Sequence, residues 1–560
     1  MDEAHGAGAG KRKRVDFNKP LKFWLIFVSL CFSCLLSALD LTAISTALPD
    51  IINDLQGEDY IWVGSAYALT STAFLPFCGS MANILGRRST MMLSLVMFML
   101  GSGLCGGARY VSSMDMLIAA RAVQGMGGGG IIAMTEIIVA DMLPLSERGV
   151  FSGIIGCVWA FASAIGPLIG GALAQEWQWL FFINLPLGLF ALGLVWAFLD
   201  IKSPKDDLKT RLRQMDIIGN VLIIGGTTAV ILGIVWGGAH HPWGAYQVYV
   251  PLAVGIIATF GAVLYDFRWA VDPTIPFTII NNRTSISGYI QTFFHGIVTI
   301  IIIYYLPVYF QAIQGSSPVR SSVQTFPLSL TIAPLAIMTG AAVAIIGKYN
   351  WSNWAGWVMM TTGVGLLALL KEGSSVHMWA GFQAIAGIGA GMLYSGLNFP
   401  ILAPTPPDLN APALAFLTFA RSYGQVFGVT IGGTLDLTLQ LKKKLPVAFG
   451  AQFGSAPDLA YAAIPVLHTL SEPMKTDVIH AFVVSLRLVW LVAIPLSAVG
   501  LLANFFCKEI PMHKHVDEKW GLAEQAKAEN DQEMGNVPPT PIVPILKSSP
   551  STGASVGLAY

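Results

Sequence analysis

The chain has 560 residues, of which 54% are hydrophobic and only 11% are charged. Soluble domains carry about 25% charged residues, so this composition excludes an ordinary water-soluble protein and indicates many membrane-spanning segments. The formal net charge is zero, so the chain lacks the basic excess typical of nucleic-acid-binding proteins.

Apolar stretches of roughly 20 residues, the length that crosses a bilayer as a helix, recur along the whole chain. We count fourteen and therefore predict an all-α polytopic membrane protein. In chain order the predicted spans are 22–48, 62–82, 89–109, 115–139, 149–174, 178–200, 215–238, 247–267, 286–311, 324–346, 354–370, 377–399, 411–435 and 479–507.

The first span carries an aspartate, which is costly inside a bilayer by a few kcal/mol. At about 1.5 Å per residue, Asp40 lies roughly 12 Å below the outer end of its span, and Arg121 lies roughly 9 Å into the fourth span. The two charged side chains therefore lie at similar depth. An aspartate beside an arginine can stay ionised, whereas burial makes its protonation reachable. The pair could therefore carry a proton, or it could only hold helices together.

Three glycine motifs follow in chain order and recur later at nearly constant offsets. GSMANILGRR at 79–88 corresponds to GAAVAIIGK at 340–348, RAVQGMG at 121–127 to QAIAGIG at 383–389, and GPLIGG at 166–171 to GVTIGG at 428–433. The offsets of 261, 262 and 262 indicate two copies of one six-span unit, with the seventh and eighth spans inserted between them. Two paired bundles with a site at their interface are a transporter design.

The distribution of Lys and Arg predicts both termini in the cytoplasm. Loops and tails on the side of the termini hold 22 of the 32 Lys and Arg, and the opposite side holds seven. Three lysines at 442–444 fall on the opposite side and are the exception to this rule. The predicted segments are a cytoplasmic tail at 1–21, a six-helix bundle at 22–200, a linker with two extra transmembrane helices at 201–270, a second six-helix bundle at 271–508 with an extracellular loop near 437–477, and a disordered cytoplasmic tail at 509–560.

Taken together, these motifs resemble the major facilitator superfamily, in particular fourteen-span drug:proton antiporters and their fungal members that export toxins and xenobiotics. The resemblance rests on LDLTAISTALPDI at 39–51, on the three glycine motifs, on WQWLFFINLP at 177–186 and on YYLPVYFQAIQGSSPVRS at 304–321. It implies the major facilitator fold, export of amphipathic small molecules and coupling to protons. Two departures are Asn83, where the family usually has aspartate, and Gln178, where it usually has arginine.

Further polar residues within the spans are candidates for coupling or binding. Glu136 could take part in proton coupling or in a polar network at the inner face, and Arg421 could hold an anionic substrate or cap a buried acceptor. His295 could contact substrate or be satisfied by hydrogen bonds alone. The other candidates for the substrate cavity are Tyr67, Gln124, Gln291, Tyr304, Tyr394 and Asn398. The candidates for conformational roles are Gly79, Asn83, Gly86, Arg87, Arg88, Gly166, Pro167, Gly170 and Gly171.

Other functional classes find little support in the sequence. Residues 125–130 fit G-x-G-x-x-G, but no strand precedes them, and no phosphate-binding G-x-x-x-x-G-K-[ST] occurs. We therefore predict no cofactor, no metal and no enzymatic activity, with protons, a small-molecule substrate and the lipid bilayer as partners of a monomer. The alternatives are proton-coupled uptake, for example of siderophores, and, in another class, a membrane enzyme or receptor. The plasma membrane is the expected location, with a vacuolar or vesicle membrane as the alternative.

Overall fold

The computed structural model describes residues 17, 19–55, 61–200, 215–237, 241–270, 272–432, 439–446, 449, 463–464, 466–467 and 469–512. Most of the predicted tails and of the loop near 437–477 lies outside these residues. The helices are α1 Leu21–Leu55, α2 Ile61–Leu85, α3 Arg87–Val111, α4 Met114–Met142, α5 Leu145–Ala172, α6 Gln178–Phe182, α7 Asn184–Phe198, α9 Ile217–Trp236, α10 Tyr246–Arg268, α11 Phe277–Ile280, α12 Arg283–Val308, α13 Pro318–Gln324, α14 Phe326–Ile346, α15 Asn350–Leu367, α16 Val376–Gly396, α17 Asn398–Leu402, α18 Asn410–Thr430, α19 Leu439–Lys444 and α22 Met474–Ala503.

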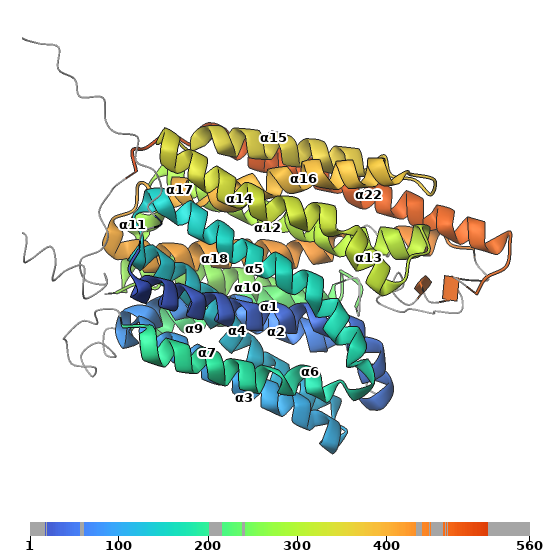
Figure 1. Ribbon diagram of the computed structural model, residues 1–560, viewed down its shortest axis with the longest axis horizontal. Coiled ribbons are helices and arrows are strands. Elements are labelled where there is room, and N and C mark those ends of the chain that lie inside the picture. Colours follow the sequence, from blue (N-terminus) through green and yellow to red (C-terminus); the bar gives the residue numbers. More distant parts are fainter. Residues whose placement is uncertain are drawn as a thin grey trace, which may run out of the picture.

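The helices form two groups that lie side by side (Figure 1), one from α1 to α7 and one from α12 to α22. α1 begins and α22 ends at the same end of the molecule, which we call the tail end; the opposite end is the loop end. Among the described residues, twelve helices are long and apolar enough to cross a membrane. α15 and α18 match the predicted spans at 354–370 and 411–435 but are not among these twelve. The all-helical, multi-spanning architecture is therefore confirmed, and the count of fourteen is not.

The glycine repeat seen in the sequence is also a repeat of helix packing. A Cβ at Gly127 of α4 would lie 2.3 Å from Phe98 N of α3, and a Cβ at Gly389 of α16 would lie 2.3 Å from Met360 N of α15. The two glycines are 262 residues apart, as are their two neighbours. Helix backbones approach this closely only where a side chain is missing. Each motif thus joins the same pair of helices in its own half of the chain.

The two groups of helices pack tightly at the tail end, where α5 contacts α14 and α2 contacts α18. A Cβ at Gly340 would lie 2.2 Å from the carbonyl carbon of Gly149, and a Cβ at Gly79 would lie 2.7 Å from Ala415 Cβ. Ser395 Oγ donates a hydrogen bond to Gly149 O at 3.2 Å. These contacts fall within two turns of the tail-end termini of their helices, so the groups meet closely at that end.

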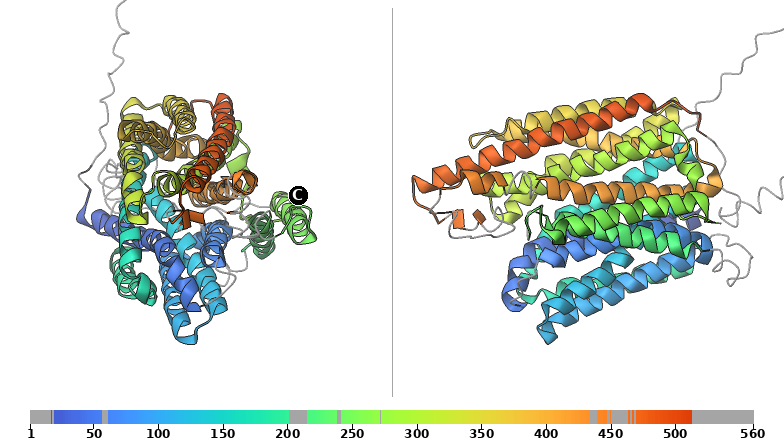
Figure 2. Two further views of the ribbon diagram at one scale, coloured as in Figure 1. Left: turned by 90° about the vertical axis from the view of Figure 1, so that its right-hand side faces the viewer. Right: turned by 180° about the vertical axis from the view of Figure 1, so that it is seen from behind.

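α9 and α10 form a hairpin on the outer edge of the molecule (Figure 2). α10 packs along α9, and α9 packs on α2. Ile257 and Phe260 of α10 are more than 70% exposed, as expected for side chains that face lipid. At the tail end of the hairpin, Thr274 Oγ1 donates to Asp216 Oδ2 at 3.3 Å, which ties the start of α9 to the segment that leads into α12. This placement is compatible with an insertion between two bundles, and the predicted domain boundaries remain predictions.

Candidate functional site

A buried polar network surrounds Asp40 within the first group of helices. Its Oδ2 accepts a hydrogen bond from Arg121 Nη1 at 2.5 Å. Its Oδ1 accepts from Gln124 Nε2 at 2.7 Å and from Asn184 Nδ2 at 2.9 Å. Both amides also donate to Ser102 Oγ, at 2.7 and 3.3 Å. Asp40 and Arg121, predicted to lie at similar depth, thus form an ion pair, and three donors from α4 and α7 hold one carboxylate of α1.

Arg121 is fully buried and is held on several sides. Its Nε donates to Val63 O at 2.9 Å, and its Nη1 also donates to Gln124 Oε1 at 2.6 Å. Its guanidinium carbon lies 4.4 Å from the ring centroid of Tyr67 and 5.9 Å from that of Phe181. These rings favour a cation in an apolar surrounding. Tyr67 and Gln124, predicted as cavity residues, belong to the surroundings of Asp40 and Arg121 in this structure.

If Asp40 were neutral, the network would still leave Arg121 with hydrogen-bond partners. Removing one partner of a buried ion pair typically costs about 3–5 kcal/mol. Here Arg121 would keep the carbonyl oxygen of Val63 and the amide oxygen of Gln124 if Asp40 took up a proton. A proton on Asp40 would therefore loosen the attraction between α1 and α4.

A second polar cluster lies where the two groups of helices face each other. Glu136 of α4 is buried, and its Oε2 pairs with Ser152 Oγ of α5 at 3.4 Å. From the other group, the guanidinium carbon of Arg421 on α18 lies 4.4 Å from the ring centroid of Tyr394 on α16. Arg421 is close enough to act electrostatically on both Glu136 and His295 of α12. We call Glu136, Arg421, Tyr394 and His295 the interface cluster.

Several nitrogen atoms of the interface cluster have no hydrogen-bond partner. These are Nε and Nη2 of Arg421 and Nδ1 of His295, all shielded from solvent. His295 Nε2 lies 3.2 Å from Ala390 O. Among the described residues, no acidic group forms an ion pair with Arg421; the recorded pairs with arginine are those of Arg87, Arg109 and Arg121. The cluster therefore has unused capacity to donate to an anion.

Arg87 forms a third network at the tail end. Its Nε donates to Asp141 Oδ2 of α4 at 2.7 Å, and its Nη1 donates to Ala82 O at 3.0 Å and to Asn83 Oδ1 at 3.1 Å. Both charged side chains are almost completely buried. Asn83 thus serves Arg87 as a neutral acceptor, at the position where the resemblance leads us to expect a carboxylate. The network joins the turn between α2 and α3 to the end of α4.

Backbone conformation and close helix contacts account for three other predicted residues, Gly86, Arg88 and Gly166. Gly86 has φ 86° and ψ 162°, a conformation that L side chains rarely adopt, so glycine is needed to pass directly from α2 into α3. Arg88 donates to Trp196 O of α7 and lies 5.8 Å from the Trp196 ring centroid. A Cβ at Gly166 would lie 2.0 Å from Thr42 Oγ1, so this glycine permits the close approach of α5 to α1.

The remaining predicted residues take different positions. Gln291 is fully buried; its Nε2 donates to Ser287 Oγ at 2.9 Å, and its Oε1 accepts from Trp357 Nε1 at 2.8 Å. Both polar groups of its side chain are therefore bonded to neighbouring side chains in this conformation. Asn398 is buried at the start of α17, and Tyr304 is 44% exposed. Pro167, Gly170 and Gly171 lie in the last turns of α5.

A network at the loop end was not found from the sequence. Arg109 of α3 pairs with Asp54 at 3.1 Å and with Glu176 at 2.9 Å, and it donates to Gln178 Oε1. Trp177 Nε1 donates to Asp54 Oδ2 at 2.9 Å. Arg109 thus supplies a cation beside Gln178, the position at which the family usually has arginine. A lone arginine at the end of the predicted span 89–109 gives no sequence signal for this role.

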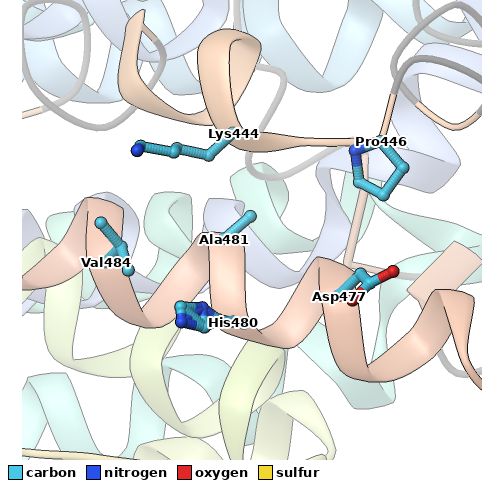
Figure 3. A pocket seen from close by; sticks show the side chains of 6 residues that line it. All are labelled: Lys444, Pro446, Asp477, His480, Ala481 and Val484. Carbon is cyan, nitrogen blue, oxygen red and sulfur yellow. The ribbon is translucent and has the colours of Figure 1, made fainter.

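Figure 3 shows a separate pocket at the loop end, near the start of α22. Its volume is about 540 Å³. The lining residues are Lys444, Pro446, Asp477, His480, Ala481 and Val484. The pocket shares no residue with the four polar networks described above. In the described residues, no group of three His, Cys, Asp or Glu side chains could hold a metal ion.

Comparisons with known proteins identify the family and agree with the observed helical fold. The family model described as Major Facilitator Superfamily matches residues 30–429. Efflux pump FUS6 of Gibberella fujikuroi is 38% identical over 528 residues, which cover 92% of this chain and 94% of the relative. The acurin A biosynthesis cluster MFS-type transporter of Aspergillus aculeatus is 34% identical over 92% of this chain and 95% of its own length. The structure of the human organic anion transporter MFSD10 has a similar fold, with a TM-score of 0.55 and 14% identity, over 88% of this chain and 100% of that one.

Proposed function

Because the chain belongs to the Major Facilitator Superfamily, we propose that it is a proton-coupled transporter that exports an amphipathic small molecule. The two curated relatives are similar over almost their entire length, and their names are those of an efflux pump and of a transporter in a biosynthesis cluster. This supports a toxin or another secondary metabolite as the class of substrate. The buried pair of Asp40 and Arg121 is the observation that carries the coupling part of the proposal.

The proposed architecture has fourteen spans, two six-helix bundles and both termini in the cytoplasm. α15 packs on α16 as α3 packs on α4, and α18 packs on α12 as α5 packs on α1. Since α3 and α5 qualify as spans by length and hydropathy, their counterparts in the repeat should cross the membrane as well. α9 and α10 would then be two additional spans at the edge. The positive charges on the side of the termini support the orientation.

In the proposed cycle the two bundles rock about the interface cluster, and Asp40 changes charge at each turnover. Ionised Asp40 holds α1 against α4 through Arg121. A proton from outside neutralises the carboxylate and weakens this attraction, which biases the equilibrium between the two arrangements of the bundles. The proton leaves on the cytoplasmic side, and the substrate moves out in exchange.

The coupling is tested with purified protein in vesicles that carry an imposed pH gradient. Since the relatives' names point to metabolites, the transported compound is identified first, by comparing metabolites inside and outside cells with and without the gene. Asp40→Asn should bind the compound but lose accumulation driven by the gradient. Asp115→Asn is the matched control because Asp115 is exposed in the first turn of α4. If Asp40→Asn accumulated the compound as well as this control, the coupling site would lie elsewhere.

The same metabolite comparison decides the direction of transport. An exporter leaves more compound inside the cell when the gene is deleted, whereas an importer leaves more outside. The second result would favour proton-coupled uptake, for example of a siderophore, over the proposed export.

A further inference from the structure

The substrate class can be narrowed from the interface cluster, on the premise that the proposed transport function is correct. We propose that Arg421 binds an anionic group of the transported molecule, namely a carboxylate or an ionised phenol or enol. The ring of Tyr394 would hold the guanidinium in place by its cation–π contact. Glu136 is the competing anion on the opposite bundle.

The location of Arg421 suits a substrate site. Arg421 lies eleven residues after the start of the 21-residue helix α18, near the middle of the span. α18 belongs to the second bundle and contacts α2 and α4 of the first. Glu136 and Ser152 contribute from the first bundle, and Tyr394 and His295 from the second. Sites near the membrane midplane, between two repeats, are where rocking transporters bind their substrates.

The free edge of the guanidinium indicates the chemistry of the ligand. Nε and Nη2 are the two nitrogen atoms without a partner, and their N–H bonds are parallel on one side of the planar group. That edge binds the two oxygens of a carboxylate with paired hydrogen bonds. Arg121, in contrast, uses its Nε for Val63 O and its Nη1 for Asp40. Of these two arginines within spans, Arg421 is therefore the one whose Nε and Nη2 are both free to bind a ligand.

The surroundings of Arg421 argue against a purely structural role in this conformation. An arginine within a span that served only stability would be expected to have a close carboxylate, because an unpaired charge in an apolar surrounding is costly. Glu136 has Ser152 as its hydrogen-bond partner and forms no recorded ion pair with Arg421. The ring of Tyr394 contributes a cation–π contact, which offsets only part of the cost of burial. An anionic ligand would supply the missing charge.

Nε and Nη2 of Arg421 are shielded from solvent in this conformation, although the Arg421 side chain as a whole is partly exposed. A ligand can reach these two nitrogen atoms only when the groups that cover them move. In its ionised form Glu136 would carry the same charge as the proposed ligand, and it lies on the opposite bundle, so it would compete with the ligand for Arg421. Neutralising Glu136 should therefore strengthen binding of an anion, whereas neutralising Arg421 should abolish it.

Binding of paired probes to the purified full chain tests the proposal without any gradient. Naphthoate, cinnamate and salicylate are compared with their neutral amides, which have nearly the same shape, by quenching of tryptophan fluorescence. The unmodified protein should bind at least one acid roughly ten- to a hundred-fold more tightly than its amide, as expected for charged hydrogen bonds. Arg421→Gln should remove this preference. Glu136→Gln should increase the affinity for the acid several-fold.

Two further variants separate recognition from folding. Arg421→Lys keeps the charge but lacks the paired N–H edge, so it should retain only part of the preference. Arg487→Gln is the control, because Arg487 is an exposed arginine within the span of α22 and should leave the preference unchanged. Absence of an acid-over-amide preference in the unmodified protein would overturn the proposal, as would an unchanged preference in Arg421→Gln. A protein that binds acids through Arg421 but fails to pump would refute the transport function alone. One that pumps with the gradient yet binds acid and amide equally would refute only this inference.

Discussion

Substitution of Gly340 by alanine should open the tail end of the molecule. A Cβ at this position would lie 2.2 Å from the carbonyl carbon of Gly149 and 2.4 Å from Val150 N. These are backbone atoms, so no side chain can rotate away. Ordinary van der Waals contact begins at 3.4 Å, whereas this Cβ would lie at 2.2 Å. α5 and α14 must therefore separate by about 1.2 Å.

Overpacking of this kind costs about 1–3 kcal/mol. The cost falls only on the arrangement in which α5 and α14 are in contact, so it shifts the equilibrium between arrangements by roughly 5- to 150-fold. Spin labels at Leu21 and Trp351 report this shift, because both side chains are exposed and lie in the first turns of α1 and α15, which begin at the tail end in different bundles. The distance distribution between the labels should move to longer values in Gly340→Ala, and turnover should fall.

Gly193→Ala provides the matched control for helix propensity. Gly193 lies in α7, and a Cβ there would meet no atom within 4 Å. If the two alanine variants gave the same distance distribution, the contact of α5 with α14 would not hold the tail end closed, and the reasoning from packing would be refuted.

Three other predictions concern the polar networks. Arg87→Ala and Asp141→Asn should each slow transport with little change in substrate affinity. The double variant should be no slower than the slower single variant, because all three lose the same ion pair. Additive losses of transport rate would contradict this. Asn83→Asp adds a second carboxylate beside Arg87 and should favour the closed tail end, so unchanged label distances would exclude a latch role. Asn184→Leu should leave the protein folded but impair proton-driven transport, and full activity would remove Asn184 from the coupling network.

Much of the network around Asp40 could be predicted from the sequence, because charged side chains within apolar spans are visible locally. A carboxylate and a guanidinium within apolar spans stand out by composition, and a rise of 1.5 Å per residue places them at one depth. Their hydrogen bond agrees with that estimate. The glycine offsets likewise predicted equivalent packing of Gly127 and Gly389.

The remaining partners depend on how each helix is rotated, which depth alone does not determine. The sequence predicts Gln124 as a cavity candidate, and the structure adds that its amide lies between Asp40 and Arg121. Asn184 was only part of a family stretch and is in fact a direct donor to Asp40. The depth of Arg421 was predictable, but its free edge became visible only from the packing of α18 against α4 and α16.

The central claim, that Asp40 couples proton movement to export, is tested most directly by comparing two modes of transport in the same vesicles. Exchange of labelled for unlabelled compound requires no net proton movement, whereas accumulation requires it. A gradient of one pH unit can drive about tenfold accumulation per proton. We predict that Asp40→Asn retains exchange and loses accumulation, and accumulation equal to that of the unmodified protein would contradict the account.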